Sequence, residues 1–235
     1  MITVIIPAFN EEVLIVKCLQ SLAEQTPTPD EILVVDNAST DATAAKVQEF
    51  IVAHPALNIR LIHESEQGCI PARETGWRAA QGDVIVHVDA DETFPPGWMQ
   101  QIRNILEKSP DLGVFGGTVR FENAPLPIFI LQVLYNWLYP YAVQIGRGAP
   151  YLCGGMTICK REVLVKLDGY RNRPADQLED YYLSVQAPRV GYKTRYFRKL
   201  YAMHSLRRYE AGGLKGFLQW GVAGLDAAQY DPELR

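Results

Sequence analysis

Two carboxylates follow an apolar run in the stretch VIVHVDADETF (Val84 to Phe94), at Asp89 and Asp91. Residues i and i+2 of an extended chain point to the same side, so both side chains can reach one ligand. Oxygen-only ligation favours Mg²⁺ or Mn²⁺ over zinc, and such a cation can hold a phosphorylated substrate. The spacing therefore indicates a metal site. It leaves two alternatives, namely a nucleophilic aspartate and a pair that only shapes a turn.

The nucleophile alternative takes a specific form. DADET matches the D-x-D-x-T signature of haloacid-dehalogenase-like phosphatases, in which the first aspartate, here Asp89, attacks phosphorus. That signature belongs on a first strand and needs a later acidic pair for its metal. Here the motif follows the fourth expected strand and no such pair comes after it, so the phosphatase is kept only as the alternative.

The elements that must position these residues alternate along the first half of the chain. Strands are expected at residues 3–7, 31–36, 58–63 and 83–89, and helices at 11–25, 41–54 (opened by the capping residues Ser39, Thr40 and Asp41), 71–80 and 98–108. Such alternation predicts an α/β fold with a mostly parallel, doubly wound sheet flanked by helices. Ligands of such sheets bind beyond the carboxyl ends of the strands. The loops PAFNEE, VDNASTD, HESEQG and VDADET should therefore converge on one edge.

The second half is less regular. A strand is expected at 113–121, a strand and then a helix within YLCGGMTICKREVLVKLDGY, a helix around DQLEDYYLSVQAPRVG, a strand at YKTRYF and a helical stretch after Gly213. No linker-like segment and no internal repeat separates the halves. Residues 1–235 are therefore expected to form one domain.

The segment from Leu126 to Val143 is apolar nearly all round. Gln132, Asn136 and two prolines interrupt it, so it is not expected to span a bilayer. We expect a buried helix here. The alternative is a helix that lies against lipid or a hydrophobic partner.

Composition and charge exclude several classes of protein. Hydrophobic residues make up 48% and charged residues 21% of the chain, which excludes a disordered protein, and a net charge of −4 gives no general case for nucleic-acid binding. One stretch departs from this average, because residues 189–215 hold a single acid, Glu210, against these basic residues: Arg189, Lys193, Arg195, Arg198, Lys199, Arg207, Arg208 and Lys215. Such a stretch suits phosphates or an anionic membrane surface, or it is simply a solvated face.

The four cysteines and the N-terminus point to a cytoplasmic protein. The cysteines show no C-x-x-C spacing and are expected to be reduced. The N-terminal MITVIIPAFNEE lacks a basic region and reads as a first strand rather than a signal peptide.

Four signatures occur together and in one order, and they carry a resemblance: IIPAFNEEVLI, ILVVDNASTDAT, GCIPARETGWRAAQGDVIVHVDAD and LEDYYLSVQAPRVGYK. From residue 3 to about residue 208 the sequence resembles a family-two nucleotide-sugar glycosyltransferase of the GT-A fold. The resemblance implies an inverting transfer from a nucleoside-diphosphate sugar (UDP, with GDP as the alternative) to a hydroxyl acceptor, with Mg²⁺ or Mn²⁺. It also implies a nucleotide-sugar-binding half at 1–118 and an acceptor-binding and catalytic-base half at 119–235.

The family's donor-binding roles carry over residue by residue. The expected contacts are Pro7, Ala8, Phe9 and Glu11 along the base and ribose, Asp36 on the base, Asn37 where the family has a second aspartate, Gly68 and Arg73 on the diphosphate side, Asp89 toward the ribose, and Arg207 and Arg208 on the diphosphate. The alternatives are structural, because Glu11 can start a helix and Arg73 can pair with Glu74 on the surface.

The remaining roles concern the metal, the base and the acceptor. Asp91 resembles the metal ligand, with His204 as a third ligand or a plain surface histidine. Asp180 resembles the catalytic base and Glu179 its companion, although two acids at a helix start are also favourable by themselves. Gly154 and Gly155 resemble the acceptor side.

The acceptor is expected to be a saccharide or a lipid-linked hydroxyl at the cytoplasmic face of a membrane, and nucleic acid is not an expected partner. Peripheral membrane contact would run through residues 126–143 and 189–215. A nucleotide-sugar-binding module without catalysis is the remaining alternative.

Overall fold

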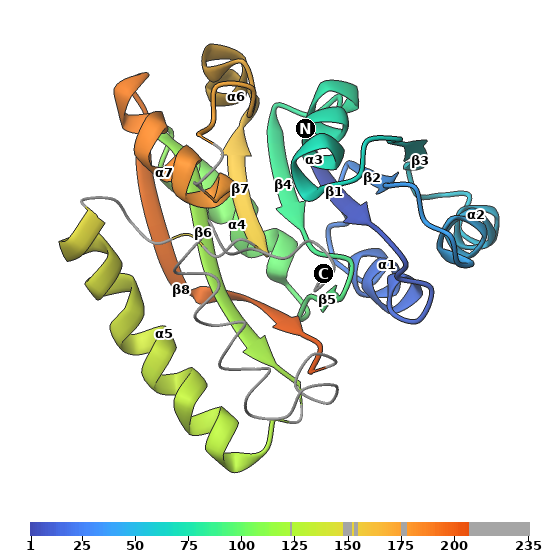
Figure 1. Cartoon of the computed structure of the whole chain (residues 1–235), viewed down its shortest axis with the longest axis horizontal. Helices are drawn as coiled ribbons and strands as arrows, with labels where there is room; N and C mark the ends of the chain where they lie inside the picture. The colour runs from blue at the N-terminus through green and yellow to red at the C-terminus, as the bar shows by residue number, and fades with distance from the viewer. Residues whose placement is uncertain (123, 148–151, 153–154, 175–177, 207–235) are drawn as a thin grey trace.

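The computed structural model describes residues 1–122, 124–147, 152, 155–174 and 178–206. Its centre is an eight-stranded sheet with the order β3-β2-β1-β4-β7-β6-β8-β5 (Figure 1). The strands are β1 (Ile2–Ala8), β2 (Glu31–Asp36), β3 (Ile59–His63), β4 (Val84–Val88), β5 (Glu92–Thr93), β6 (Leu112–Phe121), β7 (Met156–Lys160) and β8 (Lys193–His204). β3, β2, β1 and β4 run parallel, as does the pair β6–β8, whereas β7 and β5 pair antiparallel. The expected mostly parallel α/β sheet is confirmed.

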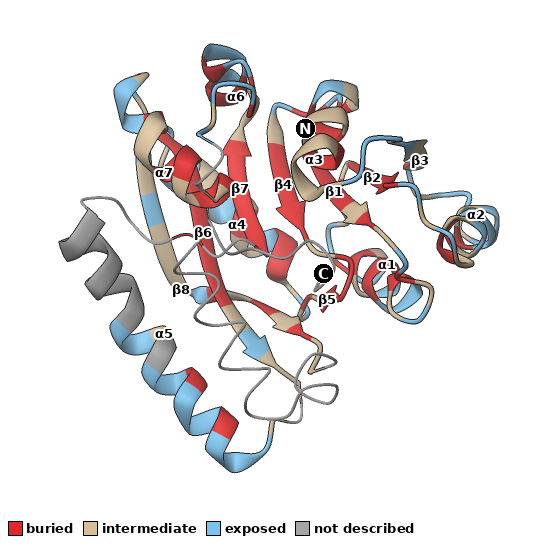
Figure 2. Cartoon of the chain, viewed as in Figure 1, coloured by how far each residue is buried: buried red, intermediate tan, exposed pale blue. Residues whose placement is uncertain are grey.

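Helices cover both faces of this sheet. They are α1 (Ile15–Ala23), α2 (Thr43–Ala53), α3 (Cys69–Ala79), α4 (Trp98–Lys108), α5 (Leu126–Arg147), α6 (Arg161–Leu167) and α7 (Glu179–Arg189). Side chains of α1, α2 and α4 join one hydrophobic core, and those of α3, α6 and α7 join a second. Figure 2 shows the central strands buried between these layers. β1 feeds both cores because successive residues point to opposite faces, with Val4 and Ile6 on one side and Ile5 on the other.

The packing of α3 on β1 depends on a glycine. A Cβ atom added at Gly76 would lie 2.5 Å from Cγ2 of Ile5 and 3.2 Å from Cγ2 of Val35. Both neighbours are fully buried β-branched side chains, so neither can swing away.

We therefore expect Gly76→Ala to lower the free energy of unfolding by about 1–3 kcal/mol through overpacking, despite the better helix propensity of alanine. Urea denaturation measures the change. A variant as stable as the wild type would contradict this close approach of α3 to the sheet.

The expected helix starts are early by a few residues. α1 begins at Ile15 rather than residue 11, and α2 at Thr43 rather than residue 41. The segments before both helices bind each other instead, since Thr43 Oγ1 accepts the Glu11 N–H at 2.8 Å and Asp41 accepts the Glu12 N–H at 3.1 Å. Asp41 still accepts the Thr43 N–H (2.9 Å), although it lies two positions before the helix.

β8 is longer than expected and irregular. Its first part pairs with the start of β6 up to Gly116↔Tyr196, and the pairing resumes at Thr118↔Tyr201. The extra residues between Tyr196 and Tyr201 form a bulge. After it, β8 runs to His204, which pairs with Glu92 of β5, a strand that the sequence did not predict.

The expectation of a buried helix at residues 126–143 is wrong for the side chains that the structure describes, at 126–134 and 136–138. α5 contacts the sheet through Ile128 and Gln132, while most of its described apolar side chains are exposed. Gln132 and Asn136 donate side-chain N–H groups to the carbonyl of Val119 in β6, at 3.2 and 3.1 Å. The two amides that interrupt the apolar run therefore face the sheet, where the Val119 carbonyl near the end of β6 accepts their hydrogen bonds. Among the described residues, no helix is long and apolar enough to cross a membrane.

Candidate functional site

The carboxyl ends of β1, β2, β3 and β4 lie at one edge of the sheet, as expected from their parallel pairing. The strand order reverses between β1 and β4, because β2 and β3 continue on one side of β1 whereas β4 leads to the second half. Crevices at such reversal points are where open α/β sheets bind ligands. Asp89 and Asp91 directly follow β4 at this point.

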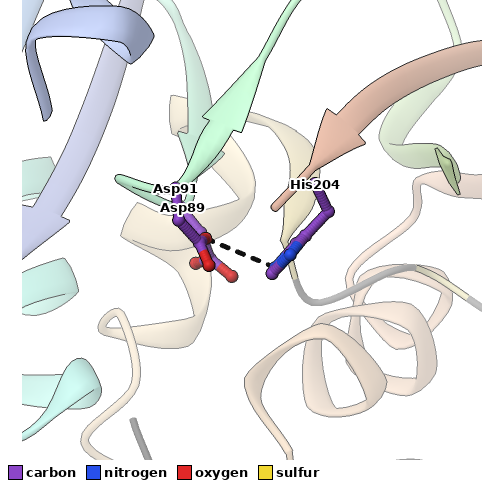
Figure 3. Close-up of side chains that lie close together, drawn as sticks. All are labelled: Asp89, Asp91 and His204. Carbon is purple, nitrogen blue, oxygen red and sulfur yellow. Dashed lines mark ion pairs between the residues drawn. The ribbon is translucent and has the colours of Figure 1, made fainter. Parts of the chain in front are cut away.

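Asp89, Asp91 and His204 form a three-residue cluster there (Figure 3). One ligand atom from each lies within 4.8 Å of the others, and Nε2 of His204 is 3.3 Å from Oδ1 of Asp91. Backbone pairing fixes the histidine, since Glu92 lies opposite His204 and the Ser205 N–H donates to the Asp91 carbonyl at 3.2 Å. The end of β8 is thereby brought to the loop after β4.

The contacts of His204 fit a cation. Its Nδ1 lies 3.1 Å from the Ser205 carbonyl, which has no hydrogen to give, so Nδ1 carries the proton. In the neutral ring, Nε2 then presents a lone pair to the Asp91 carboxylate. Two lone pairs 3.3 Å apart repel unless a proton or a metal ion lies between them. Two carboxylates and one imidazole suit a hard divalent ion, and the nitrogen favours Mn²⁺ over Mg²⁺.

We expect His204→Ala to weaken Mn²⁺ binding by about tenfold to a hundredfold, and Asp91→Asn by at least as much, because each removes a donor atom. Titration of the protein with Mn²⁺, followed by the electron paramagnetic resonance signal of the free ion, measures the affinity. His54→Ala is the matched control, since His54 stacks on Phe50 in α2 away from the site. Unchanged affinity in His204→Ala would show that β8 supplies no ligand.

Arg73 of α3 connects the metal cluster to α7. Its guanidinium forms ion pairs with Asp89 (Nη2 to Oδ1, 3.1 Å) and with Glu179, and its side chain is only 1% exposed. The surface pairing with Glu74 that the sequence left open is not what the structure shows. Because Arg73 is buried between two carboxylates, its contact with a donor diphosphate stays a prediction, and its direct action is to orient Asp89 and Glu179.

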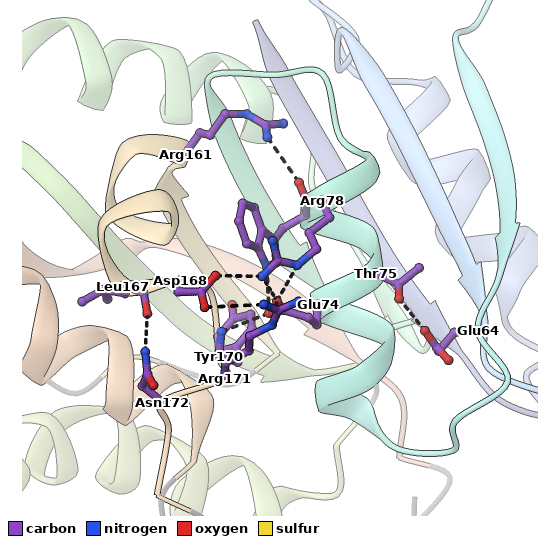
Figure 4. Close-up of polar contacts among 11 residues, drawn as sticks. Glu64, Glu74, Thr75, Arg78, Arg161, Leu167, Asp168, Tyr170, Arg171 and Asn172 are labelled. Atoms are coloured by element: carbon purple, nitrogen blue, oxygen red, sulfur yellow. Dashed lines mark hydrogen bonds and ion pairs between the residues drawn. The ribbon is translucent and has the colours of Figure 1, made fainter.

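A second polar cluster fixes the position of α3, which carries Arg73 (Figure 4). Glu74 accepts hydrogen bonds from the indole Nε1 of Trp77 (2.8 Å) and the backbone N–H of Tyr170 (3.0 Å), and it pairs with Arg78. Arg78 also pairs with Asp168 at 3.1 Å. α3 is thereby tied to the segment that follows α6.

Glu179 and Asp180 open α7 and are both buried. Burial, and then the neighbouring Glu179 carboxylate, raises the pKa of Asp180 to about 7. The Tyr181 N–H donates to Oδ1 of Asp180 at 2.7 Å, which orients the carboxyl group. A carboxylate that titrates near neutral pH beside a ligand site is suited to accept a proton.

Glu92 is a site residue that the sequence interpretation missed. It is fully buried, and its Oε2 accepts the Asp89 N–H at 3.2 Å. Burial, and then the charges of Asp89 and Asp91, raises the pKa of Glu92 well above its usual range. The only signal in the sequence is that the acid directly follows Asp91. Gly155 packs against this group, because a Cβ there would lie 2.3 Å from Glu92 Oε1 and 3.4 Å from Asp89 Oδ2.

The ends of β2 and β3 hold Asp36, the residue that is expected to contact the base. Asp36 is buried, and its Oδ2 lies 3.2 Å from Nδ1 of the more exposed His63. Within the described part of the chain, no hydrogen-bond partner reaches Oδ1 of Asp36. Asn37 has a different place, since its side-chain amide bonds the carbonyls of Glu64 and Glu66 and the N–H of Gly68. It holds the loop before α3.

The loop after β1 lies at the same edge. Ala8 is buried and its carbonyl accepts the Asn37 N–H at 2.8 Å, while Pro7 and Phe9 are half-buried and Glu11 is buried. Gly68 precedes α3 with a φ of 138°, a conformation that side chains rarely adopt. The structure thus brings the predicted residues of the first half to one edge. Gly154, Arg207 and Arg208 lie outside the described residues.

Comparison with known proteins identifies the family. Residues 3–168 match the model of Glycosyl transferase family 2, which is more than half of the 235 residues and includes the loops after all four parallel strands. The chain belongs to glycosyltransferase family 2. Family membership confirms the resemblance seen in the sequence and disfavours the phosphatase. α7 and the end of β8 lie beyond the matched residues.

Curated members of family 2 share part of this chain. Glycosyltransferase AglE of Haloferax volcanii is 36% identical over 123 residues, which are 51% of this chain and 40% of that protein. The chain thus spans less than half the length of this relative.

Solved structures of glycosyltransferases have the same architecture. The mannosyltransferase PcManGT from Pyrobaculum calidifontis, in complex with GDP-Man and Mn²⁺, matches with a TM-score of 0.70 at 26% identity, over 99% of this chain and 67% of that chain. Glucosyl-3-phosphoglycerate synthase from Mycobacterium tuberculosis, in complex with Mn²⁺, UDP and phosphoglyceric acid, matches with a TM-score of 0.60 at 21% identity, over 96% and 77% of the two chains. These likenesses confirm the GT-A-type fold.

Proposed function

We propose that this protein is a metal-dependent inverting glycosyltransferase that moves a sugar from a nucleoside-diphosphate sugar to a hydroxyl acceptor. One observation supports the proposal: Arg73 pairs with both Asp89 and Glu179, and the next residue after Glu179 is Asp180, whose pKa is raised to about 7. Donor phosphates, metal and base must meet within one sugar's reach for such a transfer.

The donor would lie along the carboxyl edge of β1, β2 and β4. Oδ1 of Asp36, a buried oxygen with no hydrogen-bond partner among the described residues, suits the imide N–H of uracil or a donor group of guanine, with the loop from Pro7 to Glu11 along the base and ribose. UDP is the first choice of nucleotide and GDP the alternative. Both choices have support, because PcManGT binds GDP-Man and the mycobacterial synthase binds UDP.

Asp91 and His204 would hold the metal, and Asp89 would lie toward the ribose. A bound Mn²⁺ or Mg²⁺ neutralises the charge that builds up on the departing nucleoside diphosphate. Asp180 takes the proton from the acceptor hydroxyl. At the same time the oxygen of that hydroxyl bonds to the anomeric carbon, and the bond from the anomeric carbon to the diphosphate breaks. Attack opposite to the leaving group inverts the anomeric configuration.

The acceptor would approach from the side of Gly155, where a side chain is excluded by Glu92. Its hydroxyl belongs to a saccharide or a lipid-linked saccharide at the cytoplasmic face of a membrane. This part of the proposal rests on the family pattern.

A thermal-shift panel tests the donor site. UDP, GDP and their sugar conjugates are each added with and without Mn²⁺, and we expect one nucleotide to raise the melting temperature only when Mn²⁺ is present. If no nucleotide has this effect, the proposed donor site is refuted. A transferring enzyme also releases nucleoside diphosphate in the presence of acceptor, and Asp180→Asn should stop that release without changing the thermal shift. A wild-type protein that shows the thermal shift but releases no nucleoside diphosphate would be a binding module instead.

A further inference from the structure

α5 is an inside-out helix. Its polar side chains Gln132 and Asn136 bond the Val119 carbonyl of the sheet, whereas most of its described apolar side chains are exposed. Figure 2 shows the described part of α5 mostly in the colour of exposed residues. The outer face, as we name it, comprises Leu126, Phe129, Ile130, Val133, Leu134, Trp137 and Leu138, each between 44% and 70% exposed. A helix that packs against its own sheet through amides and shows large apolar groups to the outside is arranged for an apolar surrounding.

The charges around the outer face have one sign. The 22 residues of α5 include no aspartate, glutamate or lysine. The guanidinium of Arg198 in β8 lies 4.8 Å from the ring centroid of Trp137, and the same strand also carries exposed Arg195 and Lys199. Arg198 and Lys199 lie in the bulge of β8, where the chain departs from its pairing with β6.

We infer that the outer face and these basic side chains of β8 dock the protein on an anionic lipid surface. A helix that lies in the interface plane inserts its apolar side into the boundary of the acyl chains, while flanking Lys and Arg bind anionic headgroups. Trp137, with an arginine over its ring, suits the level of the headgroups.

A second copy of the chain fits this surface less well. A two-fold interface between outer faces would bring Arg195, Arg198 and Lys199 of both copies toward the same seam, and α5 offers no carboxylate to pair with them. An anionic bilayer supplies both the apolar layer and the opposite charge.

The surface is continuous with the candidate site. α5 begins five residues after Phe121, which pairs with His204 and whose ring centroid lies 5.9 Å from that of His204. Docking through α5 would therefore hold the metal cluster near the headgroups. The inference does not depend on glycosyl transfer, because it rests on α5 and β8 alone.

Co-sedimentation of the whole chain with sucrose-loaded vesicles tests it. Vesicles of phosphatidylcholine and phosphatidylglycerol in equal parts are compared with vesicles of phosphatidylcholine alone. We expect binding to the mixed vesicles that weakens at high salt, and a loss of about tenfold or more in the variant Phe129→Gln/Leu134→Gln/Leu138→Gln. Arg195→Gln/Lys199→Gln should reduce binding to the anionic vesicles only.

Val52→Gln/Val165→Gln is the matched control, since these valines are 72% and 61% exposed outside α5 and should leave binding unchanged. Equal binding by the α5 variant and the wild type, or no vesicle binding by the wild type, overturns the inference. So does a wild-type dimer in light scattering that the α5 variant converts to a monomer without any vesicle binding. The Mn²⁺-dependent thermal shift with nucleotide is expected in all these variants, so a failed donor site and a failed docking surface are distinguished.

Discussion

Asp180→Asn is expected to lower kcat for glycosyl transfer by about a thousandfold while leaving donor affinity within twofold or so of the wild type. The amide keeps the shape of the side chain but cannot take the acceptor proton. Nucleoside diphosphate release measures kcat, and the nucleotide-dependent thermal shift reports donor binding. Because the Glu179–Arg73 ion pair does not involve the Asp180 side chain, the cluster of Asp89, Asp91 and His204 should remain in place.

The pH profile gives a second readout of the same variant. Asp180 accepts a proton only when ionised, and its pKa is about 7, so kcat/KM of the wild type should rise as the pH increases through 7. The contribution of Asp180 to folding stability changes with pH in the opposite direction to kcat/KM. A carboxyl whose folded pKa is raised contributes stability at low pH that is lost as the pH rises through that pKa. Asp180→Asn should therefore be more stable than the wild type at pH 8, when both are compared with their values at pH 4.

Asp111→Asn is the control for both measurements, because Asp111 is a half-exposed carboxylate that pairs with Lys193 far from the donor edge. It should alter neither kcat nor the profile near pH 7. If Asp180→Asn retained the wild-type rate and pH profile, Asp180 would not be the base.

Arg73→Met is expected to have the largest effect on stability, a loss of about 3–5 kcal/mol in the free energy of unfolding. Methionine fills much of the volume, but it leaves the buried Glu179 carboxylate and the Asp89 carboxylate without their shared cation. Urea denaturation at pH 8 measures the loss.

Arg78→Met is the matched control on the same helix. Arg78 also pairs with two carboxylates, Glu74 and Asp168, but it is 38% exposed, so removing it should cost less than about 1 kcal/mol. Arg73→Lys covers the case in which Arg73→Met does not fold. It keeps the charge but not the two-sided geometry of the guanidinium, so the protein should fold and the transfer rate should fall. Equal losses in Arg73→Met and Arg78→Met would show that burial of the Arg73 ion pairs is not important.

The strand ends were predictable because they depend on local sequence. A short run of β-branched residues followed by turn residues places Asp36 and Asp89 at the ends of β2 and β4, and parallel pairing then brings them together. The bounds of α4 follow in the same way from helical spacing after Gly97.

The partners of Arg73 could not be predicted, because Glu179 lies 106 residues further along the chain. Sequence spacing suggested the neighbour Glu74, which is one residue away and points instead to Trp77 and Tyr170. The same limit hid Glu92. The raised pKa of Glu92 depends on its burial, and Glu92 lies opposite His204 of β8, whose pairing with β5 no local pattern indicates.

The prediction that α5 is buried was wrong for a different reason. Hydrophobicity along a chain predicts that a segment avoids water, but not which surface removes it from water. In the sequence, the two amides at positions 132 and 136 look like interruptions of a core helix. In the structure they are the groups that bind the sheet.

The bulge between Tyr196 and Tyr201 separates two parts of β8, so that the two parts pair with β6 in different registers. In a regular strand, one inserted residue turns every later side chain to the opposite face. Here an insertion between Arg198 and Lys199 can be absorbed before pairing resumes, so the chain length of this corner can change without moving His204. An insertion between Tyr201 and His204 would fall in the paired part of β8, where no bulge takes up an extra residue, and it would turn the imidazole away from Asp91.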